Sequence, residues 1–456
     1  MFDVILAMTK EKGIGFEGGL PWHCREELGI FKKKTMGGFL IVGRKTAESL
    51  PNLPGRSVIV LSSNINQYEV GKNIKCKVES IFECLPYALT IFNYNGHNDE
   101  KIFIAGGATV YNEAFENWRH YIGKVHLSVM KGEYTCDTFV NFNYMDWTVE
   151  SKQEYDEFTH YVLTPSISEE KNYLELLGNV FKNGWIKNGR NGNTKSMFGK
   201  TMTFDLTNGF PLLTTKKMFF RGVVEELLFF IRGDTDSSLL SDKKIKIWDG
   251  NTNREFLDSI GKNKRRKGVM GPMYGYQWRN YNAPYDEEKA GPSEKGMDQL
   301  KIIIDQIKHD PHSRRILLTD FNPLQAHEGV LHPCHSIIIQ FYVSEGFLDI
   351  FCFNRSSDLF HGLPFNIAST ALFHTLIAQI TGLTARKFVL SLGDAHIYES
   401  HYDVVEKQLH RIPLKFPTLK INKELKSIED IEKLEYKDIK VTDYSSYPTL
   451  KADMVK

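Results

Sequence analysis

Short apolar runs recur along the first third of the chain, separated by longer amphipathic stretches. The apolar runs predict β-strands at Val4–Met8, Phe39–Val42, Ser57–Leu61, Lys101–Ile104 and Lys124–Val129. Between them the pattern predicts helices over Arg25–Lys34 and Ala108–Asn117, and residues 147–163 predict two extended segments around a polar turn. Such alternation is typical of an α/β sheet with helices on its faces.

The pattern changes after Tyr173, where longer apolar segments begin. We expect a helix with one acidic pair over Arg221–Arg232 and a long, mostly buried helix over Ile367–Ile380. The runs Ser336–Val343 and Phe347–Phe353 predict two strands that can pair antiparallel. This second part therefore favours an α+β class.

A short polar stretch around residues 164–171 separates the two patterns and contains a proline, which indicates a linker. We therefore predict one domain over residues 1–164, a short linker over 165–171 and a second domain over 172–456. At ~100–200 residues per domain, a chain of 456 residues has room for both.

Composition narrows the classes of function. Hydrophobic residues make up 41% of the chain, which favours globular cores, and 57 basic against 56 acidic residues give a net charge of +1. This balance argues against a nucleic-acid coat or a membrane-surface protein. We interpret the basic run Lys262–Lys267 as a solvated loop, with RNA binding as the alternative. The sequence shows neither a signal peptide nor an apolar run of ~20 residues, so we expect a soluble, cytoplasmic protein without a membrane partner.

The six cysteines form no Cys-x-x-Cys pair and are too few for a disulfide scaffold. A reducing compartment is the simpler interpretation. The sequence also contains no His-Glu-x-x-His segment, and we predict no metal site.

Two segments combine a strand, a glycine-containing turn and a helix, at residues 39–46 and 102–111. Glycine lets a backbone approach a phosphate closely, and the helix start offers unpaired N–H groups. Neither segment is a G-x-G-x-x-G, so a plain βα turn remains the alternative for each. The role of Glu27, near the start of a predicted helix, also has two alternatives. It is either a first-turn charge favoured by the helix dipole or a carboxylate that binds a heterocycle.

The order of the motifs resembles dihydrofolate reductase over nearly the whole first domain. These motifs are Leu20-Pro-Trp22, Glu27, Gly43-Arg-Lys-Thr46, Leu53-Pro-Gly-Arg56, Leu61-Ser-Ser63, Ala105-Gly-Gly107 and Asp137-Thr-Phe139. The resemblance implies a mixed, mostly parallel sheet with flanking helices and NADPH-dependent reduction of dihydrofolate.

The same resemblance implies roles for individual residues. Glu27 would bind the pterin and assist protonation at N5, with Ser128 as its hydroxyl partner where the family usually has threonine. Arg56 would bind the α-carboxylate of the substrate, and Gly15–Leu20 would be a mobile loop. The folate pocket would also include Ile5, Ala7, Trp22, Phe31 and Ile104. NADPH would contact Ala7, Ile14, Gly43, Arg44, Lys45, Thr46, Leu61, Ser62, Ser63, Gly106, Gly107, Ala108 and Thr109.

In the second domain, Cys334 follows a proline, precedes a histidine and begins a predicted strand. A nucleophilic cysteine must become a thiolate, and nearby arginines would lower its pKa. Arginine also binds phosphate bidentately, so a thiol beside a phosphate site suggests covalent catalysis on a nucleotide. A buried core cysteine with surface arginines is the alternative.

The residues around Cys334 resemble thymidylate synthase from about Tyr173 to the C-terminus. The segments that carry the resemblance are Gly271-Pro-Met-Tyr274, Ser313-Arg-Arg315, residues 354–369 (NRSSDLFHGLPFNIAS) and residues 393–398 (GDAHIY). It implies reductive methylation of dUMP by 5,10-methylenetetrahydrofolate, with Cys334 attacking C6 of the uracil. Tyr274 would lie in the catalytic cleft, and Glu226 would organise protons near O4.

The remaining implied residues divide between the two ligands. The dUMP site would contain Arg190, Arg314, Arg315, His335, Arg355, Ser356, Asp358, Asn366, His396 and Tyr398, with Arg314 and Arg315 supplied by the other subunit of a homodimer. Asp358 would also hold the folate pterin, and the folate would contact Lys216, Trp248, Asn251 and Gly362.

Some positions depart from the two family patterns. Asn354 replaces a usual glutamine, His361 a common apolar residue and Tyr447 a usual histidine, and the loop after Arg190 is one residue shorter than usual. Ala47 stands where the reductase family often has an aromatic residue. Together the resemblances imply a bifunctional enzyme in which the second domain releases dihydrofolate and the first reduces it. The alternative is a synthase with a weakly active or non-catalytic reductase domain.

Overall fold

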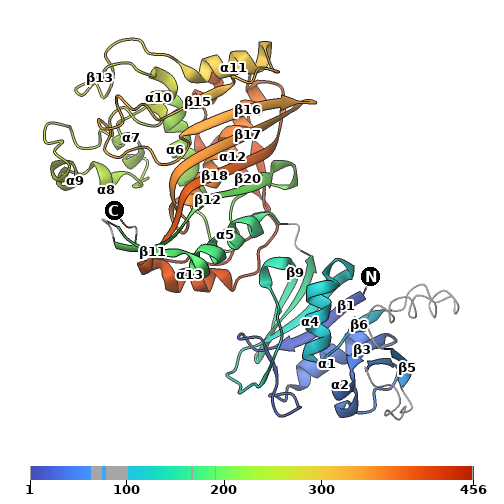
Figure 1. Cartoon of the computed structure of the whole chain (residues 1–456). Helices are drawn as coiled ribbons and strands as arrows, with labels where there is room; N and C mark the ends of the chain where they lie inside the picture. The colour runs from blue at the N-terminus through green and yellow to red at the C-terminus, as the bar shows by residue number, and fades with distance from the viewer. Residues whose placement is uncertain are drawn as a thin grey trace. The chain divides into compact units, whose positions relative to one another are not determined.

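The computed structural model describes residues 2–62, 74–78, 101–165, 168–189, 192–453 and 455. The chain divides into two compact units, Met1–Ile167 and Ser168–Lys456 (Figure 1). The predicted linker includes residues 166 and 167, which lie outside the described residues.

The first unit is built on an eight-stranded sheet with the strand order β5-β4-β3-β6-β1-β7-β10-β9. All strand pairs are parallel except β7 with β10 and β10 with β9, so the predicted mixed, mostly parallel sheet is confirmed. The strands of this sheet are β1 Phe2–Met8, β3 Phe39–Gly43, β4 Ser57–Leu61, β5 Ile74–Val78, β6 Ile102–Ile104, β7 Ile122–Met130, β9 Trp147–Glu154 and β10 Phe158–Pro165. A separate sheet of two strands pairs β2 Gly13–Gly15 with β8 Thr138–Phe139.

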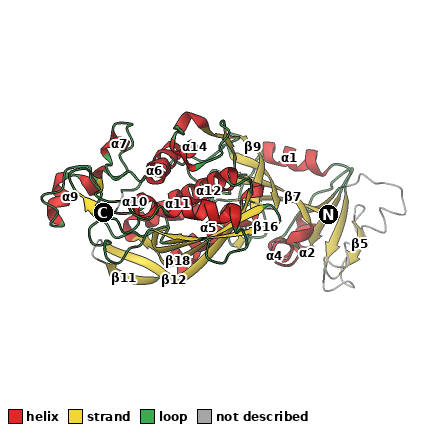
Figure 2. Ribbon diagram, turned by 90° about the horizontal axis from the view of Figure 1, so that it is seen from above, coloured by secondary structure: helices red, strands yellow, loops and turns green. Residues whose placement is uncertain are grey.

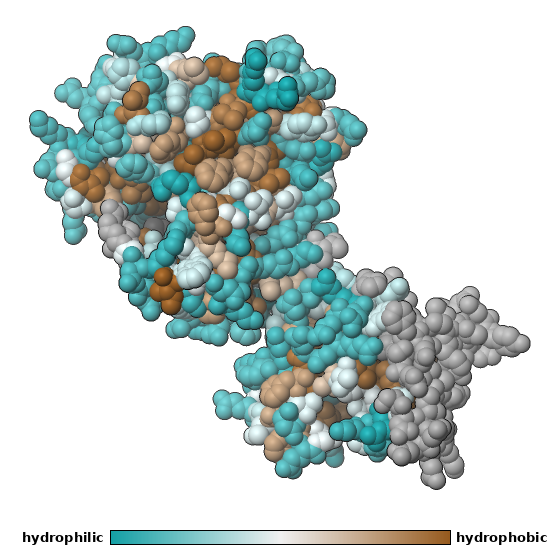
Figure 3. Space-filling model, in the orientation of Figure 1, coloured by the Kyte–Doolittle hydropathy of each residue, from teal (hydrophilic) through white to brown (hydrophobic). Residues whose placement is uncertain are grey.

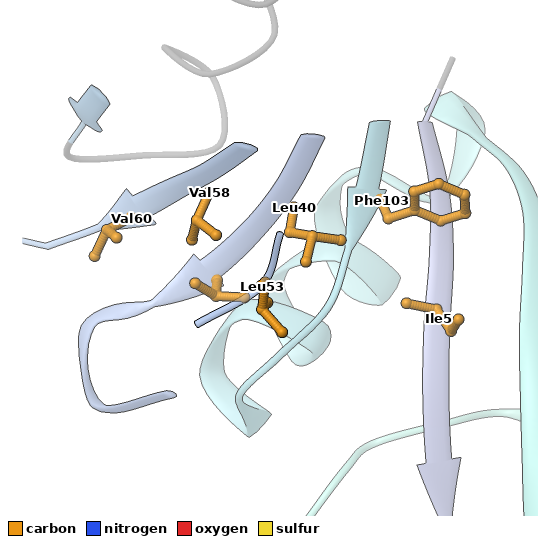
Figure 4. Packing of buried hydrophobic residues seen from close by; sticks show 7 residues of the cluster. Ile5, Leu40, Leu53, Val58, Val60 and Phe103 are labelled. Carbon is orange, nitrogen blue, oxygen red and sulfur yellow. The ribbon is translucent and has the colours of Figure 1, made fainter. Parts of the chain in front are cut away.

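Helices α1 Arg25–Thr35, α2 Arg44–Ser49 and α4 Ala108–Asn117 accompany this sheet. One part of the core is formed by apolar side chains of adjacent parallel strands, including Ile5, Leu40, Val58 and Phe103 (Figure 4). The exposed fraction of these side chains is 5% or less. Phe31 of α1 and Ala47 of α2 pack against the same cluster, so the apolar runs predicted as strands fix this part of the unit.

The second unit contains a six-stranded sheet with the order β11-β12-β18-β17-β16-β15. Its strands are β11 Trp185–Gly189, β12 Gly192–Asp205, β15 Leu317–Thr319, β16 Ile338–Ser344, β17 Phe347–Asp358 and β18 Thr384–Tyr398. Strands β16 and β17 pair antiparallel as predicted, and only β17 and β18 pair parallel. Two further sheets of two strands each pair β13 Tyr285–Asp286 with β14 Gly291–Pro292 and β19 Thr418–Ile421 with β20 Ile439–Thr442.

The helices of the second unit include α12, Gly362–Ile380, which lies over β17 and β18 beside α6, Phe220–Arg232 (Figure 2). Among the described residues, α12 is long and apolar enough to cross a membrane, but 72% of its apolar window is buried within the unit, as in a core helix. The other helices are α5 Glu170–Asn183, α7 Ser238–Ser241, α8 Asp249–Thr252, α9 Arg254–Ser259, α10 Gly275–Asn280, α11 Gln299–His309, α13 Tyr402–Leu409 and α14 Ile428–Glu432.

Two sequence interpretations need correction. Cys334 does not begin a strand, because β16 starts at Ile338 and Cys334 lies in the preceding loop. The run Lys262–Lys267 is not wholly solvated, because Arg265 is only 3% exposed and forms an ion pair with Glu287. A buried guanidinium needs such a partner, and the run itself carries only positive charges, so the distant Glu287 could not be identified from it.

Candidate active sites

The structure brings the two glycine-containing turns of the first unit together. Strands β3 and β6 are parallel neighbours, and the backbone N–H of Gly43 donates to the carbonyl of Gly106 at 2.8 Å. A Cβ atom on Gly107 would lie only 2.9 Å from Thr46 Oγ1, so glycine is required for this close approach. The two turns therefore form one backbone-lined edge at the carboxyl ends of the strands, a position where α/β sheets bind dinucleotides.

The other predicted cofactor residues lie in different settings. Ala108 and Thr109 begin α4 directly after Gly107, and Arg44 and Lys45 are exposed at the start of α2. Arg44 forms an ion pair with Glu48 at 2.8 Å. Leu61 ends β4, Ser62 follows it and is buried, Ile14 lies in β2, and Ser63 is outside the described residues.

Glu27 lies in the first turn of α1 but is 7% exposed, so it is not a solvated first-turn charge. Burial raises the pKa of this carboxyl, and the hydroxyl of Ser128 on β7 donates a hydrogen bond to it. Tyr111 of α4 lies close enough for the charge of Glu27 to raise its pKa, and its hydroxyl donates to the Ile5 carbonyl at 2.6 Å. The carboxyl therefore sits in an apolar site with one fixed donor.

Apolar side chains lie near Glu27 on strands β1, β6 and helix α1. Ile5 and Ile104 are buried, while Ala7 and Phe31 are partly buried. Trp22 is buried edge-on against Tyr134, and among the described residues its indole Nε1 has no hydrogen-bond partner. These groups fit the wall of a pocket for a flat ring.

Arg56 is a buried cation in the same unit. It is 9% exposed, its guanidinium lies 5.9 Å from the Phe31 ring centroid, and its Nη1 is 3.5 Å from Thr35 Oγ1. Burial lowers its pKa, and its Nε has no partner among the described side chains. A buried guanidinium with unused donors fits an incoming carboxylate.

The loop Gly15–Leu20 is largely exposed and is fastened by Asp137, a residue that the sequence motifs contained without a role. The backbone N–H of Glu17 donates to the Asp137 carboxylate at 2.8 Å. This bond lowers the pKa of Asp137.

In the second unit, Cys334 lies against Tyr274. The Tyr274 hydroxyl is 3.5 Å from Cys334 Sγ and accepts a hydrogen bond from the Cys334 backbone N–H at 3.3 Å. Tyr274 has a φ of 49° and Ser336 a φ of 56°, which are strained values for residues with a side chain. Both strained residues therefore lie close to the thiol of Cys334.

Arg355 lowers the pKa of Cys334, as nearby arginines were predicted to do, but burial has the larger effect. Burial raises the pKa of the thiol, and this effect outweighs the lowering by the Tyr274 hydroxyl and the Arg355 guanidinium. The sequence revealed the arginine but not the depth of burial, which favours the uncharged thiol.

The loop that carries Cys334 is held against β17. Ser356 N–H donates to the Cys334 carbonyl at 3.3 Å, and the Asn354 side chain accepts from Ser336 N–H at 2.9 Å. Asn354 therefore supplies a hydrogen bond despite its departure from the family's glutamine. His335 stacks on Tyr274 at a centroid distance of 4.4 Å, and burial lowers its pKa to about 4.

Glu226 of α6 accepts a 2.8 Å hydrogen bond from the indole of Trp248, and burial raises its pKa to about 7. Its neighbour Glu225 pairs with Lys243 instead. Lys216 is also buried, donates to the Phe360 carbonyl and has its pKa lowered to about 7 by burial.

Other predicted synthase residues lie on or next to β17, α12 and β18. His396 bonds to Asp394 at 3.1 Å, which lowers the pKa of Asp394 to about 2, and its ring lies edge-on to Tyr398. Asp358 accepts from the N–H groups of Phe360 and His361 just before Gly362 begins α12. Asn366 lies one turn into α12, and Asn251 in α8.

The predicted phosphate arginines are not all gathered in one chain. Arg355 lies at the Cys334 loop and donates to the Pro333 carbonyl at 3.2 Å. Arg314 and Arg315 are exposed just before β15, the edge strand of the sheet. Arg190 lies outside the described residues.

Comparison with known proteins assigns the chain to a family. Residues 1–167 match dihydrofolate reductase and residues 171–456 match thymidylate synthase. The bifunctional dihydrofolate reductase–thymidylate synthase of Paramecium tetraurelia is 39% identical over 474 residues, covering 99% of this chain and 98% of that protein. Those of Zea mays and Leishmania amazonensis are 36% and 37% identical, cover 99% of this chain and are themselves covered over 96% and 95%. The chain belongs to the bifunctional dihydrofolate reductase–thymidylate synthases.

This family assignment confirms both predicted activities. The enzyme reduces dihydrofolate with NADPH and methylates dUMP with methylenetetrahydrofolate. Nothing in these relatives favours the alternative of a non-catalytic reductase domain.

The C-terminal tail of the bifunctional enzyme is held by two histidines. His361 Nε2 lies 3.0 Å from the Ala452 carbonyl, and His401 Nε2 lies 2.8 Å from the Asp453 carbonyl. Their rings are edge-on at 4.9 Å. The departure at His361 therefore adds a tail contact.

Sequence reasoning missed two further buried groups in the bifunctional enzyme. Asp320, directly after β15, is fully buried, and neither of its carboxylate oxygens has a partner among the described residues. His160 of β10 contacts Ser128 at 3.2 Å. An imidazole within a predicted extended segment was the available signal for His160, whereas Asp320 follows β15 and had no comparable signal.

Proposed function

We propose that Glu27 binds the dihydropterin and helps to protonate it in the reductase unit. The observation that carries this role is a buried carboxyl of raised pKa with a fixed hydroxyl donor, Ser128. Such a carboxyl can accept hydrogen bonds from ring N–H groups, and its raised pKa favours the protonated form that can pass a proton on. Ile5, Ala7 and Phe31 would exclude water from the ring, and Arg56 would bind the substrate carboxylate.

NADPH, when bound, supplies the hydride. The joined turns fit it, because Gly107 permits close backbone approach and the start of α4 offers N–H groups to a phosphate. Arg44, Lys45 and Thr46 would contact further phosphate oxygens, and Leu61, Ser62 and Ser63 the rest of the dinucleotide. Ile14 and the loop Gly15–Leu20 would cover the nicotinamide.

In the synthase unit, we infer that Cys334 is the nucleophile toward C6 of dUMP. Only the thiolate reacts, and Tyr274 and Arg355 lower the thiol pKa while burial raises it. Arg355 and Ser356 would bind the phosphate with Arg190, Asn366 would bind the pyrimidine edge, and His396 and Tyr398 the ribose. His335 would line the dUMP site.

Glu226 would move protons near O4 of the uracil, because a pKa of about 7 allows both protonation states at neutral pH. Trp248, which orients Glu226, would also contact the folate together with Asn251, Lys216 and Gly362. Asp358 would hold the folate pterin from the start of α12.

We further propose a homodimer through the open face of the six-stranded sheet. Tyr342, Phe351 and Ile338 on this face are 65%, 40% and 36% exposed, and hydrophobic residues gather over β16 and β17 (Figure 3). Register places Leu317, Gln340, Phe351 and Val389 in one row across four strands. An apolar face of this kind is typical of an obligate interface. Arg314 and Arg315 at its edge would then enter the partner's dUMP site.

The remaining proposals concern organisation and location. We propose domain limits of 1–164 and 172–456, a cytoplasmic location, and activity without a metal, a membrane or an obligatory nucleic acid. The described cysteines Cys24, Cys136, Cys334 and Cys352 are free thiols, which suits a reducing compartment.

Two separate assays test the residue roles, namely dTMP formation from dUMP and methylenetetrahydrofolate, and NADPH oxidation with added dihydrofolate. Cys334→Ser should abolish dTMP formation and retain dUMP binding, whereas Glu27→Gln should abolish only NADPH oxidation with dihydrofolate. Loss of both activities in either variant would contradict the assignment.

Subunit complementation tests the shared site. Cys334→Ser and Arg315→Ala chains, each inactive alone as synthase, should recover about a quarter of the parent activity when mixed, because half of the dimers have one complete site. No recovery in mixed dimers would contradict the role of Arg315.

A further inference from the structure

The carboxyl of Glu27 is the end of a longer chain of buried polar groups. Ser128 on β7 donates to Glu27, and His160 on the neighbouring strand β10 lies directly opposite Ser128 in register. Its Nδ1 is 3.2 Å from Ser128 Oγ. The three side chains therefore form a continuous contact from α1 across two strands.

The direction of each hydrogen bond follows from the number of hydrogens that each group can donate. A serine hydroxyl has one hydrogen, and Ser128 gives it to Glu27. It can therefore only accept from His160, so the proton of the neutral imidazole must lie on Nδ1. The other nitrogen, Nε2, is buried without a partner among the described residues, and leaving a lone pair there costs less than burying an unpaired N–H.

The surroundings of His160 keep its imidazole neutral, so only one of the two ring nitrogens carries a proton. Burial lowers its pKa to about 4, and the charges of His126 on β7 and Lys34 on α1 act in the same direction. His126 stacks beside it at a centroid distance of 6.2 Å and an interplanar angle of 9°, and its own Nε2 lies 3.5 Å from Asp3 on β1. Glu27 is connected to His160 through Ser128.

We propose that His160 is a positioning residue of the reductase, which fixes the Ser128 hydroxyl so that it donates to Glu27. A serine side chain rotates more freely than threonine, because it lacks the second heavy atom on Cβ. The family's usual threonine restricts its own hydroxyl, whereas Ser128 in this chain is held from outside by His160. The inference rests on the proposed role of Glu27.

The test compares His160→Leu, which removes the donor, with His160→Asn, whose amide nitrogen can replace Nδ1. In the full-length enzyme, His160→Leu should raise the KM for dihydrofolate about tenfold, the effect of one hydrogen bond to a charged group. It should also move the pH profile of reduction to higher pH, because the carboxylate loses a stabilising donor. His160→Asn should stay near the parent enzyme in both measurements.

Two further variants separate positioning from packing. His126→Leu removes the stacked partner, for which no hydrogen bond to Ser128 is found among the described residues, and should leave the profile unchanged. Ser128→Thr combined with His160→Leu should restore the profile, since threonine restricts its own rotamer. An unchanged KM for NADPH and unchanged synthase activity report an intact chain.

The outcomes are distinguishable. Equal profiles for His160→Leu and the parent, equal effects of His160→Leu and His160→Asn, or an equal shift in His126→Leu would each overturn the proposal. Reductase activity retained by Glu27→Gln would instead remove the role of Glu27 on which it rests.

Discussion

The indole Nε1 of Trp248 donates a 2.8 Å hydrogen bond to the carboxyl of Glu226. Among the described hydrogen bonds, Glu226 is the only ionisable partner of this indole. Burial still raises the pKa of Glu226 to about 7, so one donor does not compensate for lost hydration. The carboxyl of Glu226 therefore gains and loses its proton near neutral pH. Its ionised form makes the folded enzyme less stable.

Glu226→Gln should change the pH dependence of stability. The folded pKa of about 7 lies above the ordinary value of 4.5, so this residue's contribution to the free energy of unfolding is greatest below pH 4.5 and falls as the pH rises through 7. The full shift corresponds to about 3 kcal/mol, and partial exposure reduces it to ~2 kcal/mol. Glutamine does not ionise, so thermal unfolding midpoints should show the variant gaining on the parent between pH 5 and pH 8.

The same variant should lose synthase activity, while reductase activity in the same chain serves as the control. Glu225→Gln is the matched variant on α6, because Glu225 pairs with Lys243. Parallel pH curves for Glu226→Gln and the parent would contradict the raised pKa.

Tyr274→Phe should weaken the nucleophile without removing it. The Tyr274 hydroxyl contacts both Sγ and the backbone N–H of Cys334 and lowers the thiol pKa. We expect alkylation of Cys334 by iodoacetamide to require higher pH, and synthase kcat to fall by roughly ten- to a hundredfold. Tyr276→Phe, which loses a hydroxyl bonded to the Ala283 carbonyl, is the control. An alkylation profile like the parent's would show that the hydroxyl does not act on the thiol.

Local pattern predicted much of the fold because periodicity reports which face of a segment is buried. Strand β4 and helix α4 begin and end at the predicted residues, Ser57–Leu61 and Ala108–Asn117. The strand expected at Cys334 was wrong because an apolar run does not reveal the turn at Ser336, whose positive φ delays β16.

The site was less predictable than the fold, because its chemistry depends on distant contacts. The motifs named Glu27, Ser128 and Cys334, but the spacing of residues does not report burial, which raises the pKa of Cys334. His160 and Asp320 belong to no motif, and their roles depend on cross-strand register and on the absence of a partner within the described residues.

Arg56→Gln should impair dihydrofolate binding more than chemistry. The guanidinium is buried beside Phe31 and has an unused Nε, which we propose faces the substrate carboxylate. We expect the KM for dihydrofolate to rise at least tenfold with kcat little changed, because a charge-assisted hydrogen bond contributes about 1.5–3 kcal/mol. Arg44→Gln, an exposed residue paired with Glu48, should instead affect only the KM for NADPH. A larger loss in kcat than in KM would contradict the role of Arg56.

His361→Leu should loosen the C-terminal tail. The variant removes the 3.0 Å bond to the Ala452 carbonyl and leaves the one between His401 and Asp453. We expect removal of the last residues by carboxypeptidase to be about three- to tenfold faster, the effect of one lost hydrogen bond. His410→Leu, which loses an exposed bond to the Glu406 carbonyl, is the control. Cleavage at the parent rate would show that His401 alone holds the tail.

Asp320→Ala should stabilise the synthase unit, because the parent buries a carboxyl whose two oxygens have no hydrogen-bond partner among the described residues. Burial raises the pKa of Asp320 well above its usual range, so the folded state binds its proton more tightly than the unfolded state. The parent therefore loses stability as the pH rises above the ordinary aspartate pKa, whereas alanine has no such dependence. We expect the free energy of unfolding to increase by about 1–2 kcal/mol and the gain to be larger at pH 8 than at pH 5.

Thermal unfolding of the full-length enzyme at both pH values measures the effect of Asp320→Ala, and the exposed Asp310→Ala provides the baseline. An ionised Asp320 would raise the pKa of both Cys334 and Tyr274, so this carboxyl lies near enough to act on the reacting thiol. Because burial raises the pKa of Asp320 itself and so favours its uncharged form, its removal should leave the alkylation profile of Cys334 unchanged. A less stable variant whose profile shifts to lower pH would instead mean that Asp320 is ionised and that its charge opposes the thiolate.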